Sequence, residues 1–289
     1  MAAQLGMLTF SIGVLTQQWH LAIMGIVYSY ITAAAMWQNF RARLPYLYDP
    51  WSEKVPPPPT LMHAMIAISI MVEVAAVFTA FVIGLAGREN LAMAQAIGYG
   101  LCAIAVSVGV WNFLDGRGVP NRAIWHWESL PAHGSATDDQ AVQRFGIKSL
   151  LPYLQGVGGG LLLALLALGY QVVLSHIPFT AEILRKTHEQ MAQTPNLRLS
   201  LAIMAVGFAP FAEEYLFRGL LFRALDREWG GWRAVLGSAA FFAIYHPALA
   251  WFPVALLGTA NAILFKKSMR LGPAVVLHMV YNSVVIAFS

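Results

Sequence analysis

The stretch FAEEYLFRG, from Phe211 to Gly219, places two adjacent glutamates and an arginine at the end of an apolar run. The rest of the chain is equally apolar, since 58% of its 289 residues are hydrophobic and only 11% are charged. Soluble domains carry roughly 25% charged residues. Together with a mean hydropathy of +0.61, this composition indicates an integral membrane protein.

Working outward from this stretch, we find eight apolar segments that are candidates for membrane helices, each of which needs about 20 residues to cross a bilayer. They are His20–Trp37, Leu61–Leu85, Leu91–Leu114, Leu150–Leu174, Leu199–Phe217, Val235–Trp251, Pro253–Phe265 and Leu271–Phe288. The seventh is the shortest, and it is either a tilted helix or a re-entrant segment. We expect an all-α polytopic bundle of about eight transmembrane helices, with 1–289 forming a single integral membrane domain.

Basic residues are divided unevenly between the two sides of such a bundle. With eight spans, 14 of the 18 Lys and Arg residues fall on one side and the other 4 on the opposite side. Cytoplasmic loops are enriched in Lys and Arg. We therefore expect both termini to face away from the cytoplasm and Arg218 to lie at the cytoplasmic rim. This bias accounts for the net charge of +4 without a nucleic-acid partner.

Few ionisable side chains fall inside the expected spans, where they are costly and usually functional. Of the fourteen carboxylates only Glu73, Glu213 and Glu214 do so, and of the eight histidines only His246 and His278 lie well inside. Apart from Glu73, all of these residues belong to the last third of the chain, which is where we expect the site.

The two adjacent glutamates face different directions on a helix, because neighbouring residues are about 100° apart. Glu214 and Arg218 are four apart and share a face, so a salt bridge would lower the cost of burying both. Glu213 then has no partner within its own helix, and a desolvated carboxylate of this kind is a suitable general base. A purely structural ion pair, with Glu213 touching water at the rim, is the alternative.

Two further pairs of residues four apart share helix faces in later spans. Phe242 and His246 form the first, and Pro247 loosens the helix there, which can aim the imidazole into a cavity. A histidine bonded to a carbonyl is the alternative. His278 and Asn282 form the second pair, and both can donate hydrogen bonds. They would suit an oxyanion hole or simply hold helices together.

Together these groups are sufficient for acyl transfer to water. Glu213 would take a proton from the water and His246 would help to hold it. His278 and Asn282 would stabilise the tetrahedral oxyanion. No serine, threonine or cysteine is paired with a histidine at comparable spacing, so a protein nucleophile is less favoured than direct attack by water.

Three motifs in this order, EEYLFRG, FAIYH and HMVYN, match Glu-Glu-x-x-x-Arg, Phe-x-x-x-His and His-x-x-x-Asn. They resemble those of the intramembrane CAAX prenyl endopeptidases of the Ras-converting type and of their prokaryotic relatives in the Abi, or CPBP, family. The resemblance covers roughly Leu199 to Phe288, so we divide the domain into N-terminal helices, 1–198, and a catalytic core, 199–289. The implied roles are water activation for Glu213 and His246, the oxyanion hole for His278 and Asn282, support for Glu214 and Arg218, and pocket shaping for Phe242.

The resemblance is to a family now usually regarded as glutamate-dependent, and we expect no metal cofactor. The compact zinc motif His-Glu-x-x-His is missing from the sequence. Zinc is the alternative, because Glu213, His246 and His278 on separate helices could bind it.

A membrane-anchored peptide or protein is the substrate that the resemblance implies, either prenylated at a CAAX-type end or carrying another C-terminal or leader sequence. Short loops and abundant alanine favour a prokaryotic inner membrane, with the site open toward the cytoplasm. Two other classes of protein stay open. A proton-coupled transporter would explain Glu73 better, and a scaffold or immunity protein would need no turnover.

Overall fold

The computed structural model describes residues 61, 63–65, 67, 68, 71, 91–115, 121–126, 147–193 and 197–288. These residues are helical apart from turns and an isolated bridge between His126 and Arg270. The first expected span, His20–Trp37, and most of the second, Leu61–Leu85, lie outside the described residues, and so does Glu73.

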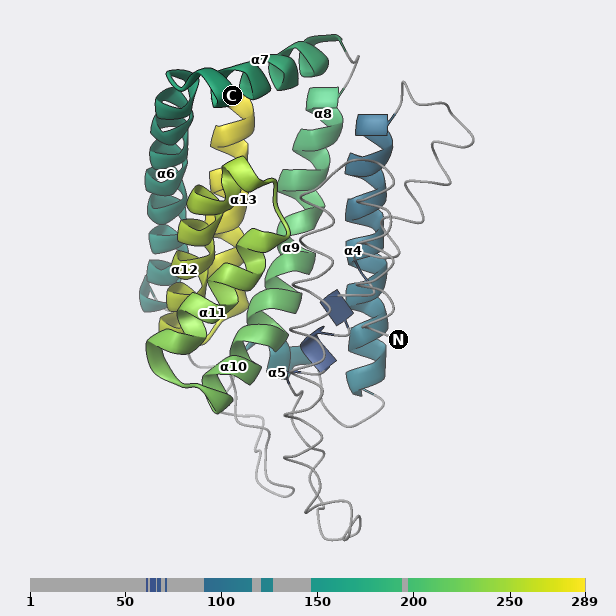
Figure 1. Ribbon diagram of the computed structural model, residues 1–289. Coiled ribbons are helices and arrows are strands. Elements are labelled where there is room, and N and C mark those ends of the chain that lie inside the picture. Colours follow the sequence, from purple (N-terminus) through teal and green to yellow (C-terminus); the bar gives the residue numbers. More distant parts are fainter. Residues whose placement is uncertain are drawn as a thin grey trace, which may run out of the picture.

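The described elements are α4 (Leu91–Asp115), α5 (Asn121–Trp125), α6 (Ile147–Ser175), α7 (Pro178–Gln193), α8 (Leu197–Ala202), the π-helical η5 (Ile203–Phe208), α9 (Ala209–Glu214), the π-helical η6 (Tyr215–Phe222), α10 (Arg223–Glu228), α11 (Gly231–Ile244), the 3₁₀ turn η7 (Ala248–Ala250), α12 (Trp251–Ser268) and α13 (Leu271–Phe288). Elements α8 to α10 follow one another without a break and form one long helix, which we call the motif helix. Figure 1 shows the motif helix between α4 on one side and α6, α11, α12 and α13 on the other.

Four helices of the described part are long and apolar enough to cross a membrane. They are Leu150–Ser175, Arg198–Glu228, Ala248–Ser268 and Leu271–Phe288, and Gly100–Asn112 and Gly231–Ile244 are shorter apolar helices. The described chain is therefore an α-helical membrane bundle, and a total of eight spans stays a prediction. The doubtful seventh segment is part of a helix of full spanning length.

Basic residues of the described helices lie toward both ends of this bundle. Helix α7, with Arg185 and Lys186, lies across one end, close to the start of α8 (Figure 1). Helix α10 lies at the opposite end, where Asp226 and Lys266 join α10 to the end of α12 through a 2.6 Å ion pair. The assignment of the α10 end to the cytoplasm stays a prediction.

The structure corrects the end of the fifth span. The motif helix does not stop at Phe217 but continues to Glu228, because Leu220, Leu221 and Phe222 extend its apolar surface and are buried. Arg218 is therefore fully buried within the bundle, and not at the rim. Glu213 lies near the middle of the span and not close to its end.

The sixth expected span, Val235–Trp251, is also wrong at its C-terminal end. Helix α11 ends at Ile244, because Pro247 has no N–H for the carbonyl one turn earlier and disfavours helical geometry in the residue before it. His246 consequently lies in a turn after the helix, and the chain re-enters a helix at Trp251.

Helices α6 and α13 pack backbone against backbone through the glycines of α6. A Cβ added to Gly156 would lie 2.6 Å from the Pro273 carbonyl oxygen, and one added to Gly160 would lie 2.6 Å from the Leu277 carbonyl oxygen. Small residues four apart permit such close contact between membrane helices, where dispersion and not the hydrophobic effect drives association. This contact anchors α13, which carries His278.

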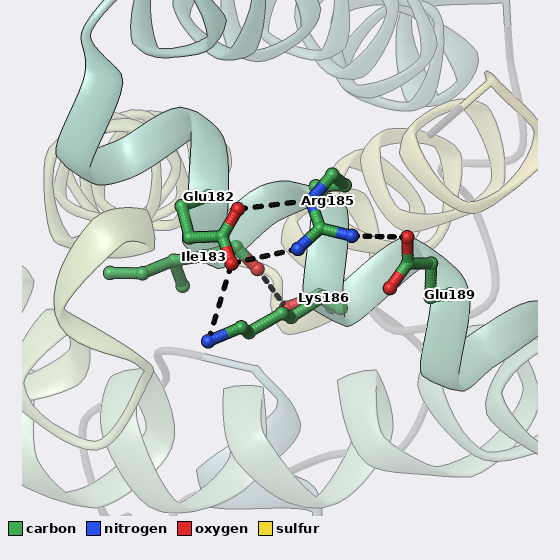
Figure 2. A network of polar contacts seen from close by, with 6 residues as sticks. Glu182, Ile183, Arg185, Lys186 and Glu189 are labelled. Carbon is green, nitrogen blue, oxygen red and sulfur yellow. Dashed lines mark hydrogen bonds and ion pairs between the residues drawn. The ribbon is translucent and has the colours of Figure 1, made fainter.

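The amphipathic helix α7 is a feature that the sequence analysis did not predict. It connects the fourth and fifth spans and exposes Phe179. Figure 2 shows its polar side, where Arg185 lies between Glu182 and Glu189 and Lys186 approaches Glu182 as well. These two cations lower the pKa of Glu182 to about 2. Helix α7 thus has an ionised polar side at the end of the bundle opposite α10 (Figure 1).

We expect Gly160→Ala to lower the free energy of unfolding by about 1–3 kcal/mol, because the new methyl group overpacks the contact between α6 and α13. Gly158→Ala is the matched control, since a Cβ there meets nothing within 4 Å. This substitution should stabilise the helix by roughly 1 kcal/mol, because alanine has a higher helix propensity than glycine. The unfolding midpoints of both variants in detergent test this. Equal shifts would show that the close contact contributes nothing.

Candidate active site

The predicted site residues come from different helices and converge inside the bundle. Glu213 and Glu214 lie on α9, Arg218 on η6, Phe242 near the end of α11, and His278 on α13. All five are buried, and none of them exposes more than 4% of its surface. The structure thus brings together charged groups that are far apart in the sequence.

Glu214 is the centre of these contacts. Its Oε2 lies 3.2 Å from Nε of Arg218, which confirms the predicted ion pair one helical turn apart. Its Oε1 accepts hydrogen bonds from Nδ1 of His278 at 2.9 Å and from Nδ2 of Asn261 at 2.7 Å. Both oxygens therefore contact protein groups, and the carboxylate is held in one orientation.

His278 joins the two glutamates. While Nδ1 donates to Glu214, Nε2 lies 3.7 Å from Oε2 of Glu213. The sequence analysis expected Glu213 to have no partner within its own helix, and the residue that faces it is this histidine from α13. This distance is longer than a normal hydrogen bond, so the two groups face each other at a distance that a direct hydrogen bond does not span.

Phe242 contacts three of the predicted residues with one ring. The guanidinium carbon of Arg218 lies 4.3 Å from the ring centroid, within the range of a cation–π contact. The rings of His278 and His246 pack against Phe242 edge to face, with centroids 5.6 Å and 4.8 Å away. Phe242 therefore sets the spacing between the guanidinium and both imidazoles.

His246 lies beside this group in the turn after α11. Its Nδ1 is 3.0 Å from the Phe242 carbonyl oxygen, and its own carbonyl accepts a 2.8 Å hydrogen bond from Nε1 of Trp251. A carbonyl can only accept, so Nδ1 carries the hydrogen and Nε2 is the ring nitrogen available for other contacts. The ring is close enough to Glu213 and His278 to interact with both electrostatically.

Asn282 is bound to the motif helix. Its Nδ2 donates a 2.6 Å hydrogen bond to the carbonyl oxygen of Ala205. The N–H groups one turn later in the helix do not donate to this carbonyl. The N–H of Ala209 donates to the Met204 carbonyl instead, and Pro210 has no N–H. The bond uses one of the two amide hydrogens of Asn282 and holds α13 against η5. The interpretation of Asn282 as a contact between helices is therefore confirmed, and its role as an oxyanion donor stays a prediction.

The sequence analysis missed two residues of α12. Asn261 is fully buried and donates to Glu214. A Cβ added to Gly258 would lie 3.1 Å from Nη2 of Arg218, so this glycine leaves room for the guanidinium. An amide in the uncharged segment Pro253–Phe265 was a usable signal, but Asn261 has no histidine or carboxylate four residues away that would have singled it out in the way that His278 singles out Asn282.

Glu213, His246 and His278, the alternative zinc ligands, are not grouped as a metal site in the described part of the chain. Among the residues that the structure describes, no three His, Cys, Asp or Glu side chains are grouped so that they could hold a metal ion. Nδ1 of both histidines is already directed to a protein acceptor. The expectation that the protein works without a metal stays a prediction.

We expect Arg218→Met to lower the free energy of unfolding by about 3–5 kcal/mol, because it leaves the buried Glu214 carboxylate without a cation. Adding Glu214→Gln should recover part of this loss, since no unpaired charge then remains. Thermal unfolding of both variants tests this, with Arg185→Met on exposed α7 as the control, where a solvent-screened ion pair contributes little to stability. A double variant that loses the sum of both single effects would contradict a buried pair.

We expect Asn282→Ala to lower the free energy of unfolding by about 1–3 kcal/mol, because the Ala205 carbonyl loses its hydrogen-bond donor. Pro210→Ala restores a backbone N–H near this carbonyl, so the same substitution should have a smaller effect in that background. Unfolding midpoints of the four proteins give the coupling. Strict additivity would mean that the bond to Ala205 does not hold α13.

A comparison with known protein families matches the region of the chain that contains these residues. Residues 195–284 match the family described as type II CAAX prenyl endopeptidase, Rce1-like. No curated protein and no solved structure matches the chain. The matched segment runs from the start of the motif helix into α13 and contains all the residues of the three motifs, so it is this part of the chain, residues 195–284, that is similar to the Rce1-like CAAX protease family.

Proposed function

We propose that this protein is an intramembrane endopeptidase in which Glu213 activates a water molecule to cleave a peptide bond. The observation that carries this proposal is the position of Glu213. It is buried, and its Oε2 faces Nε2 of His278 across 3.7 Å. A water beside this gap can reach both atoms, because a bridging water does not have to lie on the line between its partners.

Glu213 suits the role of base better than Glu214. Glu214 contacts Arg218, His278 and Asn261 through its two oxygens. Both oxygens are thus already directed to protein groups, which leaves little room for a reacting water beside this carboxylate. The family match favours proteolysis over a transporter or a scaffold.

The reaction follows from the positions of these groups. Glu213 takes a proton from the water, the water oxygen bonds to the carbonyl carbon of the substrate, and the electron pair of the C=O bond moves onto oxygen. Nε2 of His246 accepts the second hydrogen of the water and keeps the molecule in place. In the second half, the C–N bond breaks and Glu213 returns its proton to the leaving amine.

The oxyanion needs hydrogen-bond donors that are in place before the charge develops. Nε2 of His278 faces Glu213 while Nδ1 is held by Glu214. Because Nδ1 already carries a hydrogen, Nε2 donates to the oxyanion in the imidazolium form, in which both ring nitrogens carry one. The second amide hydrogen of Asn282 is the other proposed donor. Its first hydrogen, bonded to Ala205, fixes the direction of the amide.

The depth of the site limits the substrate. Glu213 lies near the middle of the span Arg198–Glu228, so a substrate has to bring its peptide bond below the membrane surface. A peptide anchored by a lipid or an apolar tail can do this. We place the entrance at the basic α10 end of the bundle, which we assign to the cytoplasm because of its Lys and Arg residues.

We expect Glu213→Gln and His246→Ala to reduce cleavage by a factor of about 10² to 10⁴ each while the protein still folds, because each removes a group from water activation. The assay uses purified protein in lipid nanodiscs with one peptide in farnesylated, acylated and lipid-free forms. Glu182→Gln on exposed α7 is the matched control and should keep full activity. An active Glu213→Gln variant would refute the assignment, and the preferred peptide form identifies the anchor.

A further inference from the structure

We propose that Asn261 of α12 is a positioning residue of this site, which holds Glu214 so that His278 presents Nε2, and not Nδ1, to the reacting atoms. The inference rests on the proposed function. Asn261 lies outside the three sequence motifs and has no assigned role in them, so it adds a fourth helix to the site.

The contacts form a chain through three elements. Nδ2 of Asn261 donates to Oε1 of Glu214 at 2.7 Å, and the same oxygen accepts Nδ1 of His278 at 2.9 Å. A carboxylate that is also paired with Arg218 acts only as an acceptor, so Nδ1 of His278 has to carry a hydrogen. This choice leaves Nε2 as the ring nitrogen that faces Glu213.

Asn261 prevents Glu214 from turning. The ion pair with Arg218 restrains only Oε2, and rotation of the carboxylate about its last bond would exchange the two oxygens or move Oε1 away from His278. A fixed donor from a separate helix removes this freedom. The ring of His278 would otherwise be able to rotate or change its tautomer, as happens when the carboxylate that orients a catalytic histidine is altered.

The backbone of α12 is shaped to bring this short side chain into reach. Gly258, one turn before Asn261, would place a Cβ 3.0 Å from Cα of Ala239 and 3.1 Å from Nη2 of Arg218. Helix α12 can therefore approach α11 and the ion pair closely. Oδ1 of Asn261 is buried and has no hydrogen-bond partner among the described residues, so it is the donor end of this amide that the site uses.

The first test separates turnover from substrate binding. We expect Asn261→Leu, which keeps the size of the side chain but removes the donor, to lower kcat by about 10- to 100-fold with little change in KM. Thr259→Val is the matched control on the same helix, because the Thr259 hydroxyl bonds only the Ala255 carbonyl of its own turn. It should leave both constants unchanged.

The second test uses pH. In Asn261→Asp the new carboxyl can donate to Glu214 only when it is protonated, so we expect its activity, relative to wild type at the same pH, to rise as the pH falls. The corresponding ratio for Asn261→Leu should stay flat. Division by the wild-type rate removes the titration of the groups that these variants share, which are Glu213, Glu214, Arg218, His246 and His278.

A spectroscopic measurement covers variants that turn over too slowly. ¹⁵N NMR of histidine-labelled protein in nanodiscs, assigned by comparison with His278→Gln, should show a hydrogen on Nδ1 of His278 in wild type. In Asn261→Leu we expect signals averaged between tautomers. Wild-type kcat in Asn261→Leu, parallel pH ratios for the two Asn261 variants, or identical ¹⁵N signals would overturn the proposal.

These outcomes are distinct from a failure of the proposed function. If wild-type protein cleaves no peptide, or if Glu213→Gln is as active as wild type, the assignment of the base is wrong, and the ¹⁵N comparison still tests the role of Asn261. If wild type is active and Glu213→Gln is not, an unaffected Asn261→Leu variant contradicts the positioning role alone.

Discussion

A single buried ion pair, between Glu214 and Arg218, is the interaction on which the rest of this site depends. Two charges with no exposed surface are costly inside a bundle unless each is compensated by an opposite charge or by hydrogen bonds. Glu214 and Arg218 compensate each other through their ion pair, and Glu214 also accepts hydrogen bonds from Asn261 of α12 and His278 of α13. The need to satisfy one carboxylate therefore fixes how three helices are placed, and the neighbouring Glu213 takes its position relative to His278 from them.

Close approach of the backbones makes these contacts possible. Membrane helices gain little from the hydrophobic effect when they associate, so their packing depends on small residues and interhelical hydrogen bonds. Gly156 and Gly160 bring α13 onto α6, and Gly258 brings α12 onto α11 and the guanidinium of Arg218. Side chains as short as those of asparagine and histidine can then connect separate helices. The same residues that stabilise the bundle thus determine the geometry of the site.

Two prolines interrupt the regular backbone hydrogen bonding beside the candidate site. One leaves a carbonyl that binds Asn282, and the other leaves His246 in a turn. Pro210 cannot donate a hydrogen bond, and Asn282 binds the Ala205 carbonyl of the preceding π-helical turn. Pro247 follows the end of α11 and leaves His246 in a turn beside Phe242. Irregular backbone at membrane depth is found where it is enclosed by protein, and π-helical segments in particular are frequent at functional sites.

The sequence by itself determined the membrane character, the ion pair of Glu214 with Arg218, and the residues from which a site can be built. Contacts within one helix follow from its period of 3.6 residues, so residues four apart could be paired without coordinates. Only the tertiary structure decided that the motif helix continues past Arg218 and buries it, that His278 lies between the two glutamates, and that Asn261 donates to Glu214. Those outcomes depend on how helices rotate and pack against each other, and the spacing of residues along one helix contains no information about the partner that another helix presents.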